Sequence, residues 1–268
     1  MIYDVQKASI LKRISAYLLD AILVCILAVG ICYVLSLVLD LNTSISQLND
    51  LTAEYEAKYG VDFDTTLEVY ENFTPEQKEN FDNAYEAMLS DERFAVVYRI
   101  FGHTILMLSL GFFVSIFVFE FVVPLVFGNG QTIGKKIFSV GVMHGNGVKI
   151  KTPFLFARAI LGKYTVETMI PICCVLMFFF TSYSLVALVV LVMLALLQLV
   201  LVIASQNNTL IHDAISFTVC VDMKSQMIFE NEDEKVAYIA DHAKDGVDRS
   251  REYFSPGQTN DDDLGEIK

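Results

Sequence analysis

Charged residues are scarce in this sequence. They make up 19% of the 268 residues, whereas a soluble domain carries roughly a quarter, and 54% of the residues are apolar. Acidic residues are sparse outside two stretches, 50–93 and 230–268, so the net charge of −13 describes those two segments and identifies no partner. This composition argues against a soluble enzyme and indicates an integral membrane protein.

Cysteine frameworks, metal-ligand patterns and catalytic couples are also missing. The five cysteines include no CxxC pair, and four lie inside apolar runs, so we expect neither disulfides nor a zinc site. The four histidines are scattered, and no serine or cysteine nucleophile has a recognisable base beside it. The segment 128–136 departs from the glycine spacing of a phosphate loop and carries Lys136 where serine or threonine is needed. We therefore expect no enzyme activity, metal, cofactor or nucleic acid partner.

Long apolar runs dominate the remaining chain. A helix needs about 20 apolar residues to cross the hydrocarbon core of a bilayer. The stretch 166–204 is too long for one helix, so the polar residues 181–184 predict a tight turn within it. The first run is too long for a cleaved signal peptide and contains Asp20, so we expect a retained helix. Four spans are predicted, at about 14–39, 100–127, 157–180 and 184–204.

The placement of lysine and arginine predicts the orientation of these spans. The N-terminal flank carries Lys7, Lys12 and Arg13, and the loop 128–156 carries four lysines and no acid. The segment 42–97 holds only three basic residues. Because positive residues collect on the cytoplasmic side, we expect a plasma-membrane protein with both termini and the basic loop in the cytoplasm and the acidic segment outside.

The polar segments carry local structure signals. Thr74 and Gln77 form a capping-box pattern around Pro75, and Gly60 would end an earlier helix, so the outer insert 42–97 is predicted to be helical. In the basic loop, 137–143 and 148–150 flank a Gly-Asn-Gly turn and predict a small interfacial hairpin. The acidic tail 226–268 is expected to form a short helix near 230–242 and to be partly disordered beyond it.

Several ionisable residues lie inside or beside the predicted spans. Such residues cost several kcal/mol in hydrocarbon unless they are paired or hydrated, so each one is a functional hypothesis. Asp20 lies about two turns beyond Arg13 in the first span, and Glu120 lies at a similar depth in the second. Lys163 and Glu167 qualify less clearly, in the third span.

Three motifs resemble the RDD family of membrane proteins, named for one arginine and two aspartates. The segment 8–20 contains Arg13 and Asp20, and 211–213 supplies His212 and the second aspartate, Asp213. The segment after the second span (GQTIGKK) matches through Gly130, Gln131, Thr132, Gly134 and Lys135. The resemblance implies an all-α, polytopic helical membrane domain over 1–225, followed by an acidic cytoplasmic tail over 226–268. It also suggests transport, with some members linked to sodium–proton exchange.

Two functional hypotheses from different classes remain open. In the first, Asp20 and Glu120 form a cation or proton site of a transporter, which would need a homo-oligomer because four spans are few for a transport path. In the second, the chain is a membrane scaffold or accessory protein whose buried polar residues are structural. We also predict that Arg13 pairs with Asp213, which would tie the first and last spans together at one membrane face.

Overall fold

The computed structural model describes residues 5–180, 184–205 and 207–242. Within these residues, four helices are long and apolar enough to cross a membrane. They are α1 (Ile10–Val38), the continuous helix of α5 (Val96–Ile116), η2 (Phe117–Val122) and α6 (Val123–Phe127), the continuous helix of α8 (Thr152–Ala157), η3 (Arg158–Met169) and α9 (Ile170–Phe180), and α10 (Ser184–Ala204). The four predicted spans are confirmed, while most of the predicted turn at 181–184 lies outside the described residues.

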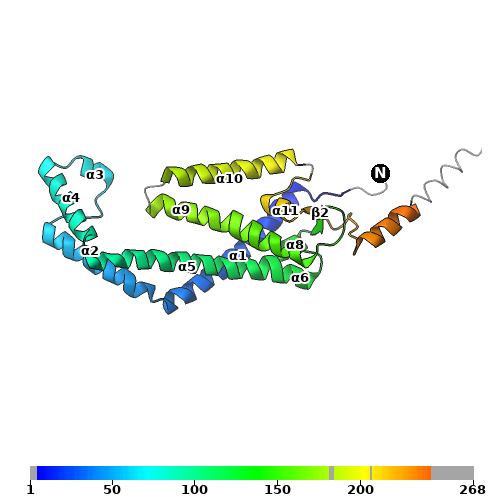
Figure 1. Ribbon diagram of the computed structural model, residues 1–268, viewed down its shortest axis with the longest axis horizontal. Helices are drawn as coiled ribbons and strands as arrows, with labels where there is room; N and C mark the ends of the chain where they lie inside the picture. The colour runs from blue at the N-terminus through cyan, green and yellow to red at the C-terminus, as the bar shows by residue number, and fades with distance from the viewer. Residues whose placement is uncertain (1–4, 181–183, 206, 243–268) are drawn as a thin grey trace, which may run out of the picture.

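Small residues let α1 approach α5 closely. The buried positions of α1 are Ala16, Asp20, Val24 and Ala28, which recur every four residues and so form one stripe. Opposite this stripe, a side chain at Gly111 would meet the Ala28 carbonyl oxygen at 3.1 Å. Small residues at a helix interface are typical of membrane proteins, where close backbone approach replaces the hydrophobic effect between helices. In Figure 1, α5 and α9 run lengthwise with α10 beyond α9, and α1 crosses them.

Two of the spans contain π-helical turns, and these turns hold four of the ionisable residues. Glu120 lies in η2, while Arg158, Lys163 and Glu167 lie in η3. In η3 the hydroxyl of Thr165 donates to the carbonyl oxygen of Ile160, five residues earlier, at 2.9 Å. Because π turns are rare and frequent at functional sites, their coincidence with the charged residues marks this part of the bundle.

A two-stranded sheet closes one end of the bundle, which we call the sheet end. Strand β1 (Val140–His144) pairs antiparallel with β2 (Thr218–Asp222). Each strand follows a five-residue helix, α7 (Ile133–Ile137) or α11 (Ile211–Ile215), and a residue of positive φ, Ser139 or Phe217. The same short helix, reversal and strand thus occur twice, and Figure 1 shows α11 and β2 at the same end of the bundle as α8 and α6.

The predicted hairpin forms in part, but the first of its two segments finds its main partner elsewhere. The turn at 145–147 does form, and Met143 makes one bridge to Lys149, but the main partner of β1 is β2. The reason lies in the length and composition of the two segments that could pair with β1. The segment 148–150 is short and leads into α8, whereas β2 offers five residues whose Val219 and Val221 pack on Met143 in a buried core.

The opposite end carries the helical insert, and its predicted character is confirmed. It comprises α2 (Leu41–Tyr59), α3 (Leu67–Glu71), α4 (Pro75–Leu89) and η1 (Glu92–Ala95). Gly60 ends α2 with positive φ, and Thr74 and Gln77 form the predicted capping box. In the tail, residues 232–242 are helical, as predicted, whereas 243–268 lie outside the described residues.

Candidate functional site

The loop motif after the second span folds around Asp20. The Asp20 carboxylate, 2% exposed, accepts hydrogen bonds from the Thr132 hydroxyl and, at 2.7 Å, from the Gly134 backbone N–H. Thr132 also caps α7, since its hydroxyl accepts from the Lys135 N–H. A side chain at Gly134 would strike the Ala16 carbonyl oxygen and the Asp20 carboxyl group. The motif therefore docks the start of α7 on α1, and Asp20 serves as its acceptor.

The two remaining motif residues hold the loop in place. The Gln131 side-chain amide donates to the Val140 carbonyl oxygen at 2.9 Å, which joins the loop to β1. Gly130 has a φ of 62°, and a side chain there would lie 2.9 Å from the side chain of Ile150. Both the positive φ and the close contact favour glycine at this position.

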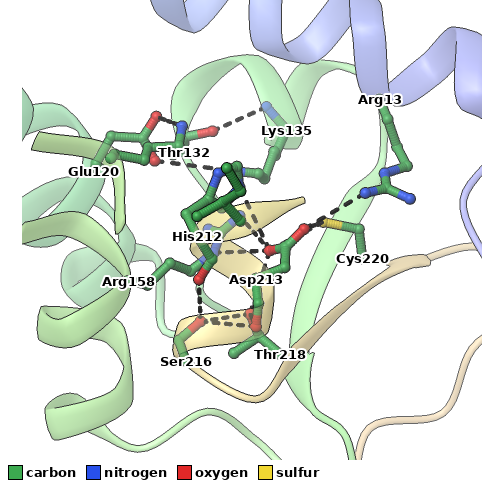
Figure 2. Close-up of polar contacts among 12 residues, drawn as sticks. Arg13, Glu120, Thr132, Lys135, Arg158, His212, Asp213, Ser216, Thr218 and Cys220 are labelled. Atoms are coloured by element: carbon green, nitrogen blue, oxygen red, sulfur yellow. Dashed lines mark hydrogen bonds and ion pairs between the residues drawn. The ribbon is translucent and has the colours of Figure 1, made fainter. Parts of the chain in front are cut away.

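Asp213 is the centre of a second buried arrangement, which we call the Asp213 cluster. Its carboxylate lies 2.9 Å from Nη2 of Arg158 and 3.5 Å from Nη2 of Arg13. Figure 2 shows the two guanidinium groups approaching Asp213 from opposite sides. The Thr218 hydroxyl donates to the same carboxylate at 3.3 Å. The predicted pairing of Arg13 with Asp213 is therefore present, and it connects α1 with α11.

Histidine extends this cluster toward the third span. The Nδ1 atom of His212 lies 2.8 Å from the Glu167 carboxylate, and its Nε2 atom lies 3.5 Å from Asp213. Burial lowers the pKa of His212, although both carboxylates oppose that effect. Burial would raise the pKa of Asp213, but the adjacent positive charges, Arg158 and Arg13 among them, hold it well below its ordinary value. Asp213 is thus ionised at neutral pH.

Glu120 is the centre of a third arrangement, the Glu120 cluster. Its carboxylate, 3% exposed, contacts the ammonium group of Lys163 and lies 3.8 Å from that of Lys135. Lys163 comes from η3 and Lys135 from α7, so this cluster joins the second and third spans to the loop motif. Burial together with the nearby charge of Arg158 lowers the pKa of Lys135 to about 8.

A cavity of about 190 Å³ borders the Glu120 cluster. Glu120, Lys163 and Glu167 contribute to its wall, together with apolar residues of α1 and α5. Asp20 is not among the residues that line it. The two carboxylates that were predicted to form one site therefore have different hydrogen-bond and ion-pair partners: Asp20 accepts from neutral donors, and Glu120 lies beside an ammonium group and borders the cavity.

A comparison with protein-family models identifies the chain. The model of the RDD family matches residues 7–216, which is most of the chain. The protein belongs to the RDD family. The match includes Arg13, Asp20 and Asp213, so the resemblance drawn from the sequence motifs is confirmed. Neither the curated proteins nor the solved structures include a match.

One residue of this RDD site escaped the sequence analysis. Arg158, 1% exposed, contacts Asp213 more closely than Arg13 does, yet it lies at the start of the third span, where an arginine reads as a boundary residue. A usable signal was present, because Arg158, Lys163 and Glu167 recur at intervals of five and four residues. In a π-helical segment this spacing keeps charged side chains near one face.

Proposed function

We propose that this RDD protein is a carrier, not an enzyme, that exchanges a small monovalent cation for a proton at the Glu120–Lys163 pair. The observation that carries the proposal is the position of this pair: both side chains are buried inside membrane spans and both border the 190 Å³ cavity. A carboxylate in a cavity can bind a cation, and its ammonium partner can give up a proton.

A contribution to folding stability does not by itself explain a buried ion pair of this kind. Buried ion pairs can often be replaced by apolar residues of similar volume at no cost in stability, because desolvation offsets the attraction between the charges. Ionisable residues inside spans are typical of proton and ion pathways, and π turns favour functional sites. All three considerations support an exchange role for Glu120 and Lys163.

The exchange step conserves the charge of the site. In the resting state the Lys163 ammonium neutralises the Glu120 carboxylate. A cation that enters the cavity and binds Glu120 takes over this neutralisation, and Lys163 then releases one proton to water, since an unpaired buried charge is costly. Departure of the cation reverses the step. One cation therefore moves against one proton with no net change in buried charge.

The surroundings of the bundle complete the proposal. We propose that the protein lies in the plasma membrane, and the positive-inside rule supports an orientation with both termini and the loop 128–156 in the cytoplasm. We also propose a homo-oligomer, because four spans are few for a transport path and α10 leaves Val189, Val192 and Leu196 exposed. Lipid or a second copy would cover this face.

The alternative, a membrane scaffold without transport, is favoured by one observation. Asp20 accepts two hydrogen bonds from neutral donors and lines no part of the 190 Å³ cavity, which suits a purely structural carboxylate. Interhelical polar contacts of this kind stabilise membrane proteins without any transport role. We therefore assign Asp20 to the framework and Glu120 to the exchange step.

A flux assay on reconstituted vesicles separates the two functions. The carrier proposal expects a sodium or lithium gradient to drive proton flux, read with an internal pH dye, in vesicles that contain the purified wild-type protein. Glu120→Gln should reduce this flux at least about tenfold, whereas Glu54→Gln in the helical insert should leave it unchanged. Flux no greater than that of empty vesicles for the wild type, or equal flux in Glu120→Gln and wild type, contradicts the proposal.

A further inference from the structure

A second, much smaller cavity lies between the Asp213 and Glu120 clusters. Its volume is about 30 Å³, and its lining includes Arg13, Lys135, Arg158 and Lys163. None of the described residues that line it is an aspartate or a glutamate. Figure 2 shows Lys135 and the Glu120 carboxylate on one side of this region, with Arg158 and Arg13 around Asp213 on the other. Four positive side chains thus share one small space.

The carboxylates at the centres of the two clusters are each shared by two of these cations. Asp213 contacts Arg158 and Arg13, and Glu120 contacts Lys163 and Lys135. Asp20 and Glu167 balance the formal charge of the wider network, and like Asp213 and Glu120 they do not line the cavity. Each cluster therefore has two cations for one central carboxylate. The cavity lies between the two clusters.

Two of the cations also lack an acceptor. Nη1 of Arg158 and Nζ of Lys135 are buried and have no hydrogen-bond partner among the described residues. The residues are 1% and 7% exposed. A buried donor without an acceptor costs about 1–3 kcal/mol, and more when it is charged. Burial, together with the charges of Arg158 and Lys163, lowers the pKa of Lys135 to about 8, although Glu120 and Asp20 oppose this effect.

We propose that this cavity binds one small inorganic anion of halide size, such as chloride. The four charged groups are donors only, so they suit a ligand that only accepts. About 10–15 Å³ is enough for one water-sized ligand, so 30 Å³ has room for one ion of about halide size.

The position of the bound anion gives it a structural consequence. The four cations come from α1, α7 and η3, so one ion would join the first span, the loop motif and the third span. It would supply the missing acceptor to Arg158 and Lys135. The two cavities share Lys163, but the anion site does not rest on the exchange proposal, because the four cations surround the small cavity whether or not a cation is exchanged at Glu120.

Anion titration of the purified full-length protein tests the site. The protein is prepared in gluconate, and chloride is added at constant ionic strength while the thermal unfolding temperature is recorded. Chloride should raise this temperature saturably in the wild type, since a ligand that binds only the folded state stabilises it. Lys135→Gln should weaken the apparent affinity at least about tenfold, whereas Lys136→Gln, an exposed neighbour on the same helix, should not.

Several results would overturn the proposed anion site. Identical unfolding temperatures in chloride and gluconate overturn the proposal, as does a saturable response to sulfate that equals the response to chloride. If Lys135→Gln does not fold, bromide soaked into crystals of the wild type supplies a second measurement. An anomalous peak within hydrogen-bond distance of Arg158 Nη1 supports the anion site, and its absence in a well-ordered cavity contradicts it.

Discussion

Two ion clusters at opposite ends of this protein use the same chemistry in different surroundings. In the helical insert, Arg93 lies 2.7 Å from Glu54 and 2.8 Å from Asp91. In the Asp213 cluster, Arg158 lies 2.9 Å from Asp213. The distances are nearly equal, but the Arg93 side chain is 55% exposed and the Arg158 side chain only 2%.

The comparison shows that distance does not set the energetic role of an ion pair. Water and salt screen the pair of Arg93 and Glu54, whose side chains are each 55% exposed, so either charge stays well solvated when the other is removed. Water does not solvate the charges of the Asp213 cluster in this way, because a charge left alone there remains in a medium of low dielectric constant. The buried cluster should therefore be sensitive to single substitutions and the insert cluster tolerant of them.

The largest expected effect comes from removing the buried partner. Arg158→Ala should reduce the free energy of unfolding by about 3–5 kcal/mol, because Asp213 would lose its closest counterion while it stays buried. Denaturant or thermal unfolding of the purified protein in detergent measures this loss. The matched change in the insert, Arg93→Ala, should produce no measurable change. Equal losses in the two variants would show that burial does not separate the clusters.

The next effect tests how tightly the backbone is packed beside the buried charges. Gly134→Ala places a methyl group against the Ala16 carbonyl oxygen and the Asp20 carboxyl group, which should cost about 1–3 kcal/mol by forcing α7 away from α1. The same unfolding measurement applies. Gly102→Ala in α5 is the control: no atom lies within 4 Å of the new methyl group, and alanine favours a helix by up to about 1 kcal/mol. A neutral Gly134→Ala would refute the tight docking of α7.

The elements that the sequence revealed are those whose signal is local. Apolar runs of bilayer length predicted all four spans, and a capping box with its glycine stop predicted the insert helices. The partner of β1 was not predictable in this way, because β2 lies more than seventy residues later and is separated from it by two spans. Strand pairing over such a distance depends on how the helices pack.

The residues of the candidate site were likewise predictable only where their sequence signal is local. The family motifs drew attention to Arg13, Asp20 and Asp213, and the depth of Glu120 in its span marked it too. The counterions of Glu120 were not visible, since Lys135 reaches it from a loop and Lys163 from another span. The grouping of Asp20 with Glu120 rested on equal depth alone, and depth does not specify which neighbours a side chain faces.

The smallest effect concerns pH and His212. The imidazole faces Glu167 at 2.8 Å, Asp213 at 3.5 Å and the charge of Arg158, and burial lowers its pKa below the ordinary 6.5. Between the folded-state pKa and 6.5 the unfolded chain binds a proton that the folded protein does not, so stability falls as the pH falls through this window, by at most about 1.4 kcal/mol per pH unit. Thermal unfolding between about pH 7.5 and 5.5 measures it. His212→Gln should remove this slope, and His242→Gln on the exposed tail helix should retain it. A wild type that gains stability as the pH falls would mean that His212 is charged in the folded state and acts as a further cation of the buried cluster.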